Sequence, residues 1–359
     1  TVLIGCGGRE HAIANKLYNK VNILTIGNYK NPAIDKLSKK YIVSELTNDL
    51  ILEHCKNYII KYVIIGPEAP LDNKLTDEFL KINIPVIGPA YDYAKIETDK
   101  HFCRFLLNKY NLDQYSPKYR LISHKDKERF DSLFNDIISE IPDFVIKPCK
   151  LKSGKGVKVY KEHFDNIDDA KLYIKQILDL QENVLIEERL IGEEFSLMSF
   201  TDSISCKHMP IVKDYKRAFD GDKGPNTGSM GSVSFNDHSM PFLTKDDVNT
   251  AKMLNEILVQ SLNNYYKYNM VDSIKFDYIY NKNSESDDSN VSSPNGSVFI
   301  DNVNIGYKGI LYGSFIKTSS GIKIIEYNAR FGDPEAINVL SILETDLNEI
   351  FTAIILNRL

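Results

Sequence analysis

A lysine at the end of an apolar run, followed by a loop rich in glycine and lysine, is the first group of residues suited to chemistry. The run is Phe144-Val145-Ile146, the lysine is Lys147, and the loop reads Lys152-Ser153-Gly154-Lys155-Gly156. Such a lysine can reach a nucleotide phosphate, and glycine lets backbone N–H groups approach phosphate oxygens because it has no Cβ. The loop is not a Walker motif, since the chain has no Gly-x-x-x-x-Gly-Lys-Ser/Thr pattern. Taken alone, it is also typical of an exposed hairpin turn, so both interpretations stay open here.

A second apolar run ends in carboxylates. It reads Val184-Leu185-Ile186 and continues into Glu187, Glu188, Leu190 and Glu194. A strand exit of this kind can form an adenine slot, in which backbone groups and one acid pair with the purine edge while a later glutamate holds the ribose hydroxyls. The alternative is a solvated acidic strand exit, because glutamates are mostly exposed.

Two oxygen-bearing side chains and an arginine alternate in a third run, which extends from Ile324 to Glu335. Glu326 and Asn328 lie two residues apart, so on a strand both point to the same face. Two hard oxygen ligands on one face suit Mg²⁺, which keeps its other positions for water and nucleotide phosphates. Arg330, in the same register, can hold a carboxylate or phosphate through two hydrogen bonds. A purely structural alternative is a polar strand face with an arginine salt bridge.

Strands and helices alternate in the first 97 residues, and this alternation must position the groups that follow. The apolar runs expected to be strands are Val2–Ile4, Asn22–Ile26, Tyr62–Ile65 and Pro85–Ile87. Helical stretches separate them, the first from Arg9 to Tyr18, which predicts βαβ units and a doubly wound, mainly parallel sheet in an α/β fold. Several runs end in Gly or Gly-Pro, where such sheets place their ligand loops. We therefore expect an N-terminal βαβ domain over residues 1–97.

Three further segments are expected after position 97. Residues 98–118 contain a linker helix from Thr98 to about Ser116, residues 119–187 form a small unit with a helix from Asp165 to Ile177, and residues 188–359 form a larger unit. The larger unit is expected to contain a long helix near 245–267 and strands at Gly309–Ile316 and Ile322–Tyr327.

Residues 281–306 of the larger unit are biased toward Ser, Asn and Asp. A segment that polar cannot bury enough apolar area to order itself, so we expect a surface insertion. The alternative is an exposed hairpin around Ser297–Ile300.

The composition excludes several classes of protein. The 359 residues carry 44 Lys and Arg against 49 Asp and Glu, a net charge of −5, and so lack the basic excess of a dedicated nucleic-acid binder. No apolar run approaches the roughly 20 residues that span a bilayer, and no secretory signal precedes the first strand, so we expect no membrane partner and a cytoplasmic location. The five cysteines are odd in number and far apart, which is typical of reduced thiols, and we expect Cys149 to be a packing residue.

Four longer motifs connect these pieces. They are Ile4-Gly5-Cys6-Gly7-Gly8-Arg9-Glu10-His11-Ala12, Gly66-Pro67-Glu68-Ala69-Pro70-Leu71, Lys216-Arg217 with Gly224-Pro225-Asn226-Thr227-Gly228-Ser229-Met230-Gly231, and Arg330-Phe331-Gly332-Asp333-Pro334-Glu335. With the three blocks above, in this order, they span nearly the whole chain and resemble the phosphoribosylamine–glycine ligases, a family of ATP-grasp ligases. The turn at Gly27–Pro32 matches the family only loosely. The resemblance implies a two-lobed ATP-grasp unit after the N-terminal domain. Family members usually continue beyond the position of Leu359 into a small domain, which we expect to be absent here.

The resemblance also implies an activity. In this family ATP phosphorylates the carboxylate of glycine, and the amine of 5-phosphoribosylamine attacks the glycyl phosphate, giving glycinamide ribonucleotide, ADP and phosphate for purine biosynthesis. Such catalysis needs positioning and charge neutralisation rather than a protein nucleophile. The implied partners are the two small substrates, and fusion to or association with other purine-pathway enzymes is compatible with the sequence. Two other hypotheses stay open: a different ATP-grasp carboxylate–amine ligase, and a catalytically silent ATP-binding scaffold.

The resemblance assigns residues motif by motif. For the ATP phosphates and the lid over them it implies Lys100, Lys147, Ser153, Gly154, Lys155 and Gly156. For adenine and ribose it implies Glu187, Glu188, Leu190 and Glu194, and for Mg²⁺ or Mn²⁺ Glu326 and Asn328. For the phosphoribosylamine side it implies Gly8, Arg9, Glu10, His11, Pro67 and Glu68, with a plain helix-face contact as the alternative for His11. For the shared substrate pocket it implies Asp214, Lys216, Arg217, Asn226, Thr227 and Gly228. Arg330 is implied for the glycine carboxylate or its acyl phosphate, so the catalytic candidates are Arg330, Lys155 and Asp214.

Overall fold

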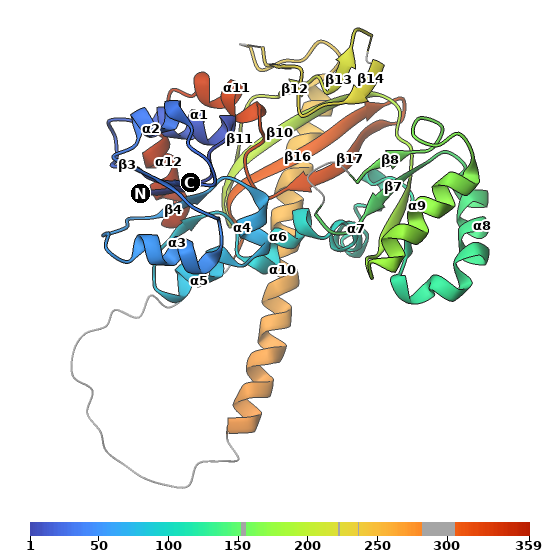
Figure 1. The fold of residues 1–359 in the computed structure, drawn as a ribbon, viewed down its shortest axis with the longest axis horizontal. Helices are drawn as coiled ribbons and strands as arrows, with labels where there is room; N and C mark the ends of the chain where they lie inside the picture. The colour runs from blue at the N-terminus through green and yellow to red at the C-terminus, as the bar shows by residue number, and fades with distance from the viewer. Residues whose placement is uncertain (152–155, 222, 236, 282–305) are drawn as a thin grey trace.

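The N-terminal part of the chain is a five-stranded sheet with the order β3-β2-β1-β4-β5 (Figure 1). In the computed structural model, the described residues are 1–151, 156–221, 223–235, 237–281 and 306–359, with the backbone alone for 226 and 268–281. The strands are β1 (Val2–Ile4), β2 (Leu24–Gly27), β3 (Lys40–Val43), β4 (Val63–Ile65) and β5 (Val86–Ile87). All neighbouring pairs run parallel, which confirms the predicted sheet.

Strands β1, β2, β4 and β5 of this N-terminal sheet are buried throughout, and for this reason they read as continuous apolar runs, whereas the edge strand β3 is partly exposed. Val2 and Ile4 of β1 pack in one apolar cluster and Leu3 in another. The helices that follow the strands are α1 (Gly8–Leu17), α2 (Pro32–Leu37), α3 (Asn48–Cys55), α4 (Glu68–Asp72), α5 (Leu75–Lys81) and α6 (Tyr91–Thr98).

The strand order of the N-terminal sheet reverses around β1, and the loops after β1 and β4 therefore meet at one edge. They approach so closely that a Cβ added at Gly5 would lie 2.9 Å from Cδ of Pro67. Gly5 also has a φ of +111°, which favours glycine. The two motifs that begin at Ile4 and Gly66 are thus neighbours in space.

A second sheet, here called the middle sheet, has the order β6-β9-β7-β8. Its strands are β6 (Tyr119–Ile122), β7 (Phe144–Pro148), β8 (Lys158–Val159) and β9 (Val184–Glu188). Helices α8 (Phe130–Glu140) and α9 (Ile167–Asp179) share a separate apolar cluster with it. Helix α9 matches the predicted helix, whereas α8 was not predicted.

The predicted single helix from Thr98 to Ser116 was wrong in its extent. Helix α6 ends at Thr98, and α7 (Lys100–Lys109) begins afresh because the Asp99 side chain accepts hydrogen bonds from the first-turn N–H groups of His101 and Phe102. Only a short 3₁₀ turn, η1 (Asp113–Tyr115), follows. The break places Lys100 at the first position of α7.

The third sheet, here called the central sheet, is antiparallel with the order β11-β10-β16-β17. It consists of β10 (Glu193–Asp202), β11 (Cys206–His208), β16 (Lys308–Thr318) and β17 (Gly321–Asn328), in agreement with the strands expected near 309–316 and 322–327. The long helix α10 (Lys245–Asn281) packs against it and continues beyond the expected end near 267 (Figure 1). Two small two-stranded sheets lie at one end, β12 (Lys213–Asp214) with β15 (Ser232–Val233) and β13 (Arg217–Phe219) with β14 (Lys223–Asn226).

The C-terminal helices α11 (Glu335–Ser341) and α12 (Leu347–Ile355) return to the N-terminal sheet, where red and blue ribbons lie together in Figure 1. Phe351 of α12 packs edge-on against Tyr62, with ring centroids 6.1 Å apart. Apolar residues of the N-terminal sheet, the central sheet and these two helices form one cluster, so the site is built on a continuous core.

The expected polar insertion at 281–306, apart from its two end residues, and the alternative hairpin at 297–300 lie outside the described residues. Within the described part of the chain, no helix has the length and apolar character needed to cross a membrane.

Candidate active site

A buried cluster of two cations and one carboxylate joins the middle sheet to α7. Lys147 is the last residue but one of β7, and its Nζ lies 2.7 Å from Oε2 of Glu187 on β9. Arg104 of α7 holds the same carboxylate with two bonds, Nε to Oε1 at 2.6 Å and Nη2 to Oε2 at 3.0 Å. Glu187 is only 2 % exposed. Burial alone would raise the pKa of Glu187, but Arg104 and Lys147 outweigh it and lower this pKa to about 2.

Arg104 was not predicted as a site residue. Its one signal in the sequence is its position four residues after Lys100, which places both on the same side of α7. Lys100 itself is half-buried, and its Nζ donates a 3.5 Å hydrogen bond to the carbonyl of Lys150.

Cations from four separate segments of the chain act on the charge of Glu326 on β17. Burial would raise the pKa of its carboxyl, but Lys147, Lys100, Lys216 and Arg330 act in the opposite direction and lower it. Glu326 therefore stays ionised among positive charges. Asn328 is also half-buried two residues further along the strand, and Nη2 of Arg330 donates to its Oδ1 at 3.5 Å.

Lys216 and Asp214 extend this charged site toward the small sheets. Nζ of Lys216 lies 3.7 Å from Oε2 of Glu194, and Oγ of Ser229 donates a 2.5 Å hydrogen bond to Oδ1 of Asp214. Burial alone would lower the pKa of the Lys216 ammonium, but the carboxylates of Glu194, Glu326 and Asp214 raise it. Burial raises the pKa of Asp214, although the hydrogen bond from Ser229 opposes this shift.

The segment that carries the Gly-Pro-Asn-Thr-Gly run is hydrogen-bonded to the backbone of Lys216. Both the backbone N–H and the hydroxyl of Thr227 donate to the Lys216 carbonyl, at 2.7 and 2.8 Å. Gly228 is exposed, and the side chain of Asn226 lies outside the described part of the chain. Thr227 therefore supports the backbone around Lys216, which places this lysine beside Glu194.

Arg217, in contrast, is already paired with a residue that follows β8. Its Nη2 lies 2.8 Å from Oε2 of Glu162, and its Nη1 donates to the Gly224 carbonyl at 3.0 Å. Arg189 also pairs with Glu162. The hydrogen bond from Arg217 lowers the pKa of Glu162, whose partial burial acts in the opposite direction.

Arg330 lies between the central sheet and the N-terminal domain. Its Nη2 is 2.9 Å from Oε1 of Glu97 and its Nε is 3.6 Å from Oε2 of Glu68. Its Nη1 donates to the Phe331 carbonyl at 3.2 Å. Glu97, at the end of α6, was not predicted as a site residue, since nothing in its local sequence distinguishes it.

The first glycine-rich loop meets the Arg-Phe-Gly-Asp-Pro-Glu run. Glu10 accepts a 2.6 Å hydrogen bond from the Gly7 N–H and another of 2.6 Å from Nε of Arg9, which ties the start of α1 together. Nη1 of Arg9 donates to the Phe331 carbonyl at 3.0 Å, and a Cβ at Gly8 would lie 3.1 Å from Oδ1 of Asp333. Arg9 and Gly8 thus lie against the loop that follows β17, whereas Glu10 lies among the glycine-rich loops of the N-terminal domain.

His11 is exposed, and it contacts the loop through the backbone hydrogen bond from its N–H to the Gly7 carbonyl, at 3.1 Å, which favours the plain helix-face interpretation for its side chain. Pro67 is the residue before α4, and Glu68 is its first residue. The structure thus places Glu68, but not His11, next to Arg330.

The remaining residues predicted to bind the nucleotide lie at or after the end of β9, in β10 and in the loop before β8. Glu188 and Leu190 are half-buried at the end of β9, and Glu194 is exposed. Gly156 is buried, and its carbonyl accepts a 2.8 Å hydrogen bond from the Tyr173 hydroxyl. Ser153, Gly154 and Lys155 lie outside the described residues.

Glu335 is the last residue of the Arg-Phe-Gly-Asp-Pro-Glu run, and it was not predicted as a site residue. It is buried, and the Tyr312 hydroxyl donates to its Oε1 at 2.7 Å. Within the residues that the structure describes, no group of three or more His, Cys, Asp or Glu side chains is arranged to hold a metal ion.

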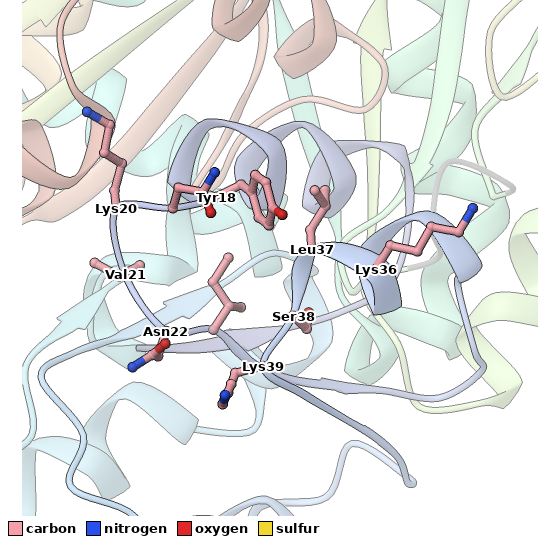
Figure 2. Close-up of a pocket in the computed structure, with 10 residues that line it drawn as sticks. Tyr18, Lys20, Val21, Asn22, Lys36, Leu37, Ser38 and Lys39 are labelled. Carbon is pink, nitrogen blue, oxygen red and sulfur yellow. The ribbon is translucent and has the colours of Figure 1, made fainter.

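A surface hollow of about 470 Å³ lies elsewhere on the N-terminal domain (Figure 2). It is lined by residues 18–23 and 36–39, which precede β2 and β3. It therefore opens at the amino ends of these parallel strands, whereas ligands bind at the carboxyl ends. None of the predicted site residues lines it.

Two family models match the chain. The N domain of phosphoribosylglycinamide synthetase matches residues 1–97, and the ATP-grasp (A) domain of phosphoribosylglycinamide synthetase matches residues 98–271 and 285–336. A phosphoribosylamine–glycine ligase from Methanocorpusculum labreanum is 40% identical over 349 residues, which are 96% of this chain and 70% of the relative. A relative of the same name from Methanocaldococcus jannaschii is 37% identical over 364 residues, covering 100% of this chain and 73% of its own length.

Solved structures show the same fold at lower identity. The phosphoribosylamine–glycine ligase of Thermotoga maritima has a TM-score of 0.68 and 22% identity, covering 99% of this chain and 75% of that chain. A D-alanine–D-alanine ligase from Bacillus anthracis has a TM-score of 0.61 and 13% identity, covering 99% and 97%. The predicted arrangement of a parallel N-terminal domain and a two-lobed ATP-grasp unit is confirmed. The chain therefore belongs to the phosphoribosylglycinamide synthetase family of ligases, with the N domain of that family followed by its ATP-grasp domain.

Proposed function

We propose that this chain ligates glycine to 5-phosphoribosylamine at the expense of ATP, giving glycinamide ribonucleotide, ADP and phosphate in purine biosynthesis. Besides the family, one observation carries the proposal: Lys100, Lys147, Lys216 and Arg330, from four separate segments of the chain, all act electrostatically on Glu326. Such a concentration of positive charge suits a reaction in which a phosphoryl group moves between anionic oxygens.

The nucleotide would lie between the middle and central sheets. We assign Lys100 and Lys147 to its phosphates, with Ser153, Gly154, Lys155 and Gly156 as the lid. Glu187, Glu188, Leu190 and Glu194 would surround adenine and ribose. Lysine ammonium groups fixed at strand and helix ends orient the phosphates and neutralise their charge without proton transfer.

The residues at β17 fit a hard divalent cation. Glu326 stays ionised because cations surround it, and Asn328 offers a second oxygen donor on the same face of the strand. We propose that these two residues hold Mg²⁺ or Mn²⁺. When bound, the metal would supply positive charge beside the transferred phosphoryl group.

The substrates would meet where the N domain faces β17. We assign Gly8, Arg9, Glu10, Pro67 and Glu68 to the phosphoribosylamine side, together with His11, whose side chain is exposed. The residues of the shared pocket would be Asp214, Lys216, Arg217, Asn226, Thr227 and Gly228. Arg330 would orient the glycine carboxylate or its acyl phosphate, with Glu97 and Glu68 fixing its guanidinium.

This assignment corresponds to an N-terminal domain at 1–97, a linker at 98–118, a lid subdomain at 119–187 and a central subdomain at 188–359. We further propose a cytoplasmic location and no nucleic-acid partner, in keeping with a net charge of −5 and small substrates. Association with other purine-pathway enzymes is compatible with these assignments.

The test is release of ADP by the purified chain in the presence of Mg-ATP, glycine and 5-phosphoribosylamine formed in situ from ribose 5-phosphate and ammonia. We expect ADP and glycinamide ribonucleotide in equal amounts, and neither product when glycine or the amine is left out. A panel of other acids, including D-alanine, separates this activity from that of a different ATP-grasp ligase. ADP release with another acid but not with glycine would reassign the substrate, and no release with any acid would favour the silent scaffold.

A further inference from the structure

Arg104 connects elements that lie far apart in the chain. It is 3 % exposed in the middle of α7, and its guanidinium contacts both carboxylate oxygens of Glu187 on β9. The same Nη2 donates a 2.6 Å hydrogen bond to the carbonyl of Ile325 on β17. One side chain therefore links α7, the middle sheet and the central sheet.

The contacts of Glu187 show how its charge is divided. Arg104 engages both oxygens, whereas Lys147 approaches only Oε2, at 2.7 Å. A lysine ammonium has three N–H donors, so a single contact leaves donors for other anions. Without Arg104, Glu187 and Lys147 would form a one-to-one ion pair in a buried place, and the lysine charge would be neutralised there.

The bond to Ile325 has a second consequence. Ile325 directly precedes Glu326 on β17, so this hydrogen bond holds the backbone beside Glu326 against α7. Lys147 is on the middle sheet and Glu326 is on the central sheet, so their separation depends on how these sheets are held. The guanidinium of Arg104 is hydrogen-bonded to Glu187 of the middle sheet and to Ile325 of the central sheet. Because this group is planar and rigid, it fixes the separation of the two sheets better than a flexible amine can.

We propose that Arg104 is a positioning residue for the nucleotide site: it shares the charge of Glu187, so that Lys147 keeps its ammonium for the ATP phosphates, and it holds Lys147 and Glu326 at a fixed spacing. The inference rests on the proposed function only in assuming that Lys147 meets the nucleotide. If Arg104 had only a structural role, its substitution would lower the stability of the fold and would affect the affinities for ATP and glycine to the same extent. A positioning residue changes the affinity for ATP selectively.

The experiment compares Arg104→Lys and Arg104→Met with the wild-type chain. We measure the Kd of Mg-ATP and Mg-ADP by calorimetry, the KM values of ATP and glycine, and the free energy of unfolding in urea. The loss of hydrogen bonds to a charged group predicts Mg-ATP binding weaker by about tenfold or more in Arg104→Met, with a partial recovery in Arg104→Lys. The KM of glycine should stay within about twofold of the wild-type value, since uniform damage to the fold would move both constants.

The matched control is Asp247→Asn, which breaks the half-buried ion pair of Lys317 with Asp247 between α10 and β16. This variant should lose stability while binding Mg-ATP as the wild type does. If Arg104→Met binds Mg-ATP with unchanged Kd, or if the KM values of ATP and glycine rise equally, the inference is wrong. Should Arg104→Met fail to unfold cooperatively, Arg104→Lys decides between the same two outcomes. The binding measurement needs no ligase turnover, so it separates a failure of this inference from a failure of the proposed function.

Discussion

Buried Glu97 and half-buried Arg330 form an ion pair between the end of α6 and the loop after β17, with Nη2 and Oε1 2.9 Å apart. The other oxygen of Glu97 accepts a 2.7 Å hydrogen bond from the Ala329 N–H. The Glu97 carboxylate thus holds two consecutive residues of this loop, Ala329 and Arg330, the second of which is proposed to orient the carboxylate of the substrate glycine. Burial raises the pKa of Glu97, whereas Glu97 and Glu68 together raise the pKa of Arg330 against the effect of its burial, so these carboxylates stabilise the charged guanidinium.

Glu97→Gln should weaken this junction. The amide can still accept the Ala329 N–H but no longer balances the Arg330 charge, so we expect a loss of about 2 kcal/mol in the free energy of unfolding. We also expect a higher KM for glycine, because Arg330 would turn further toward Glu68. Urea unfolding and steady-state kinetics measure the two effects.

Glu78→Gln is the control for Glu97→Gln. It removes an ion pair on the surface of α5, where Lys81 Nζ lies 2.7 Å from Glu78 Oε1 and solvent reaches both side chains. We expect a change below about 1 kcal/mol. Equal losses of stability in the two variants would contradict the structural role given to Glu97.

A pH dependence follows from Glu187. Its folded-state pKa of about 2 lies below its ordinary value of 4.5, so ionisation stabilises the fold. The contribution is complete above about pH 4.5, is lost as the pH falls toward 2, and amounts to about 3 kcal/mol. The free energy of unfolding of the wild type should therefore exceed that of Glu187→Gln most at neutral pH, and the difference should shrink below pH 4.5. A difference that stays constant down to pH 2.5 would contradict the ion-pair description.

Local patterns in the sequence were sufficient to predict four of the five strands of the N-terminal sheet, whereas β3, whose end residues Lys40 and Val43 are exposed, was missed. The continuous apolar run Val2–Ile4 predicts a strand buried on both faces, and the two-residue spacing of Glu326 and Asn328 predicts their shared face. Helix α8 was missed although Phe130, Phe134 and Ile137, at helical spacing, are buried. The helix predicted from Thr98 was too long because the capping preference of Asp99 was not weighed against the apolar pattern.

The supporting residues of the site could not be found in the same way. Arg104 contacts Glu187 across 83 positions, and Glu97 contacts Ala329 across 232. Such pairs depend on how sheets pack against each other, which no local period encodes. Arg217 illustrates the reverse case, because its motif suggested the substrate pocket while its guanidinium is paired with Glu162 from the segment after β8.

The thiols give an independent measure of packing. Burial raises the pKa of Cys149 to about 12 and that of Cys55, Cys103 and Cys206 to about 11. Since the thiolate is the reactive form, these four should react slowly with Ellman's reagent at pH 8 and rapidly in guanidinium chloride. Fast labelling of Cys149 in the folded chain would show that it is more than a packing residue.

Glu326 is the residue whose loss should affect chemistry most and folding least. Glu326→Ala removes the carboxylate on which Lys100, Lys147, Lys216 and Arg330 act, and with it the proposed ligand for Mg²⁺. We expect turnover to fall by more than about 100-fold, while cooperative unfolding in urea is retained. Glu326→Asp, which keeps the charge on a shorter side chain, should retain some activity and require more Mg²⁺ for half-maximal rate. Glu344→Ala, at an exposed acid outside the site, is the control and should leave rate and metal requirement unchanged. Near-normal turnover of Glu326→Ala at ordinary Mg²⁺ concentrations would remove this residue from the metal site.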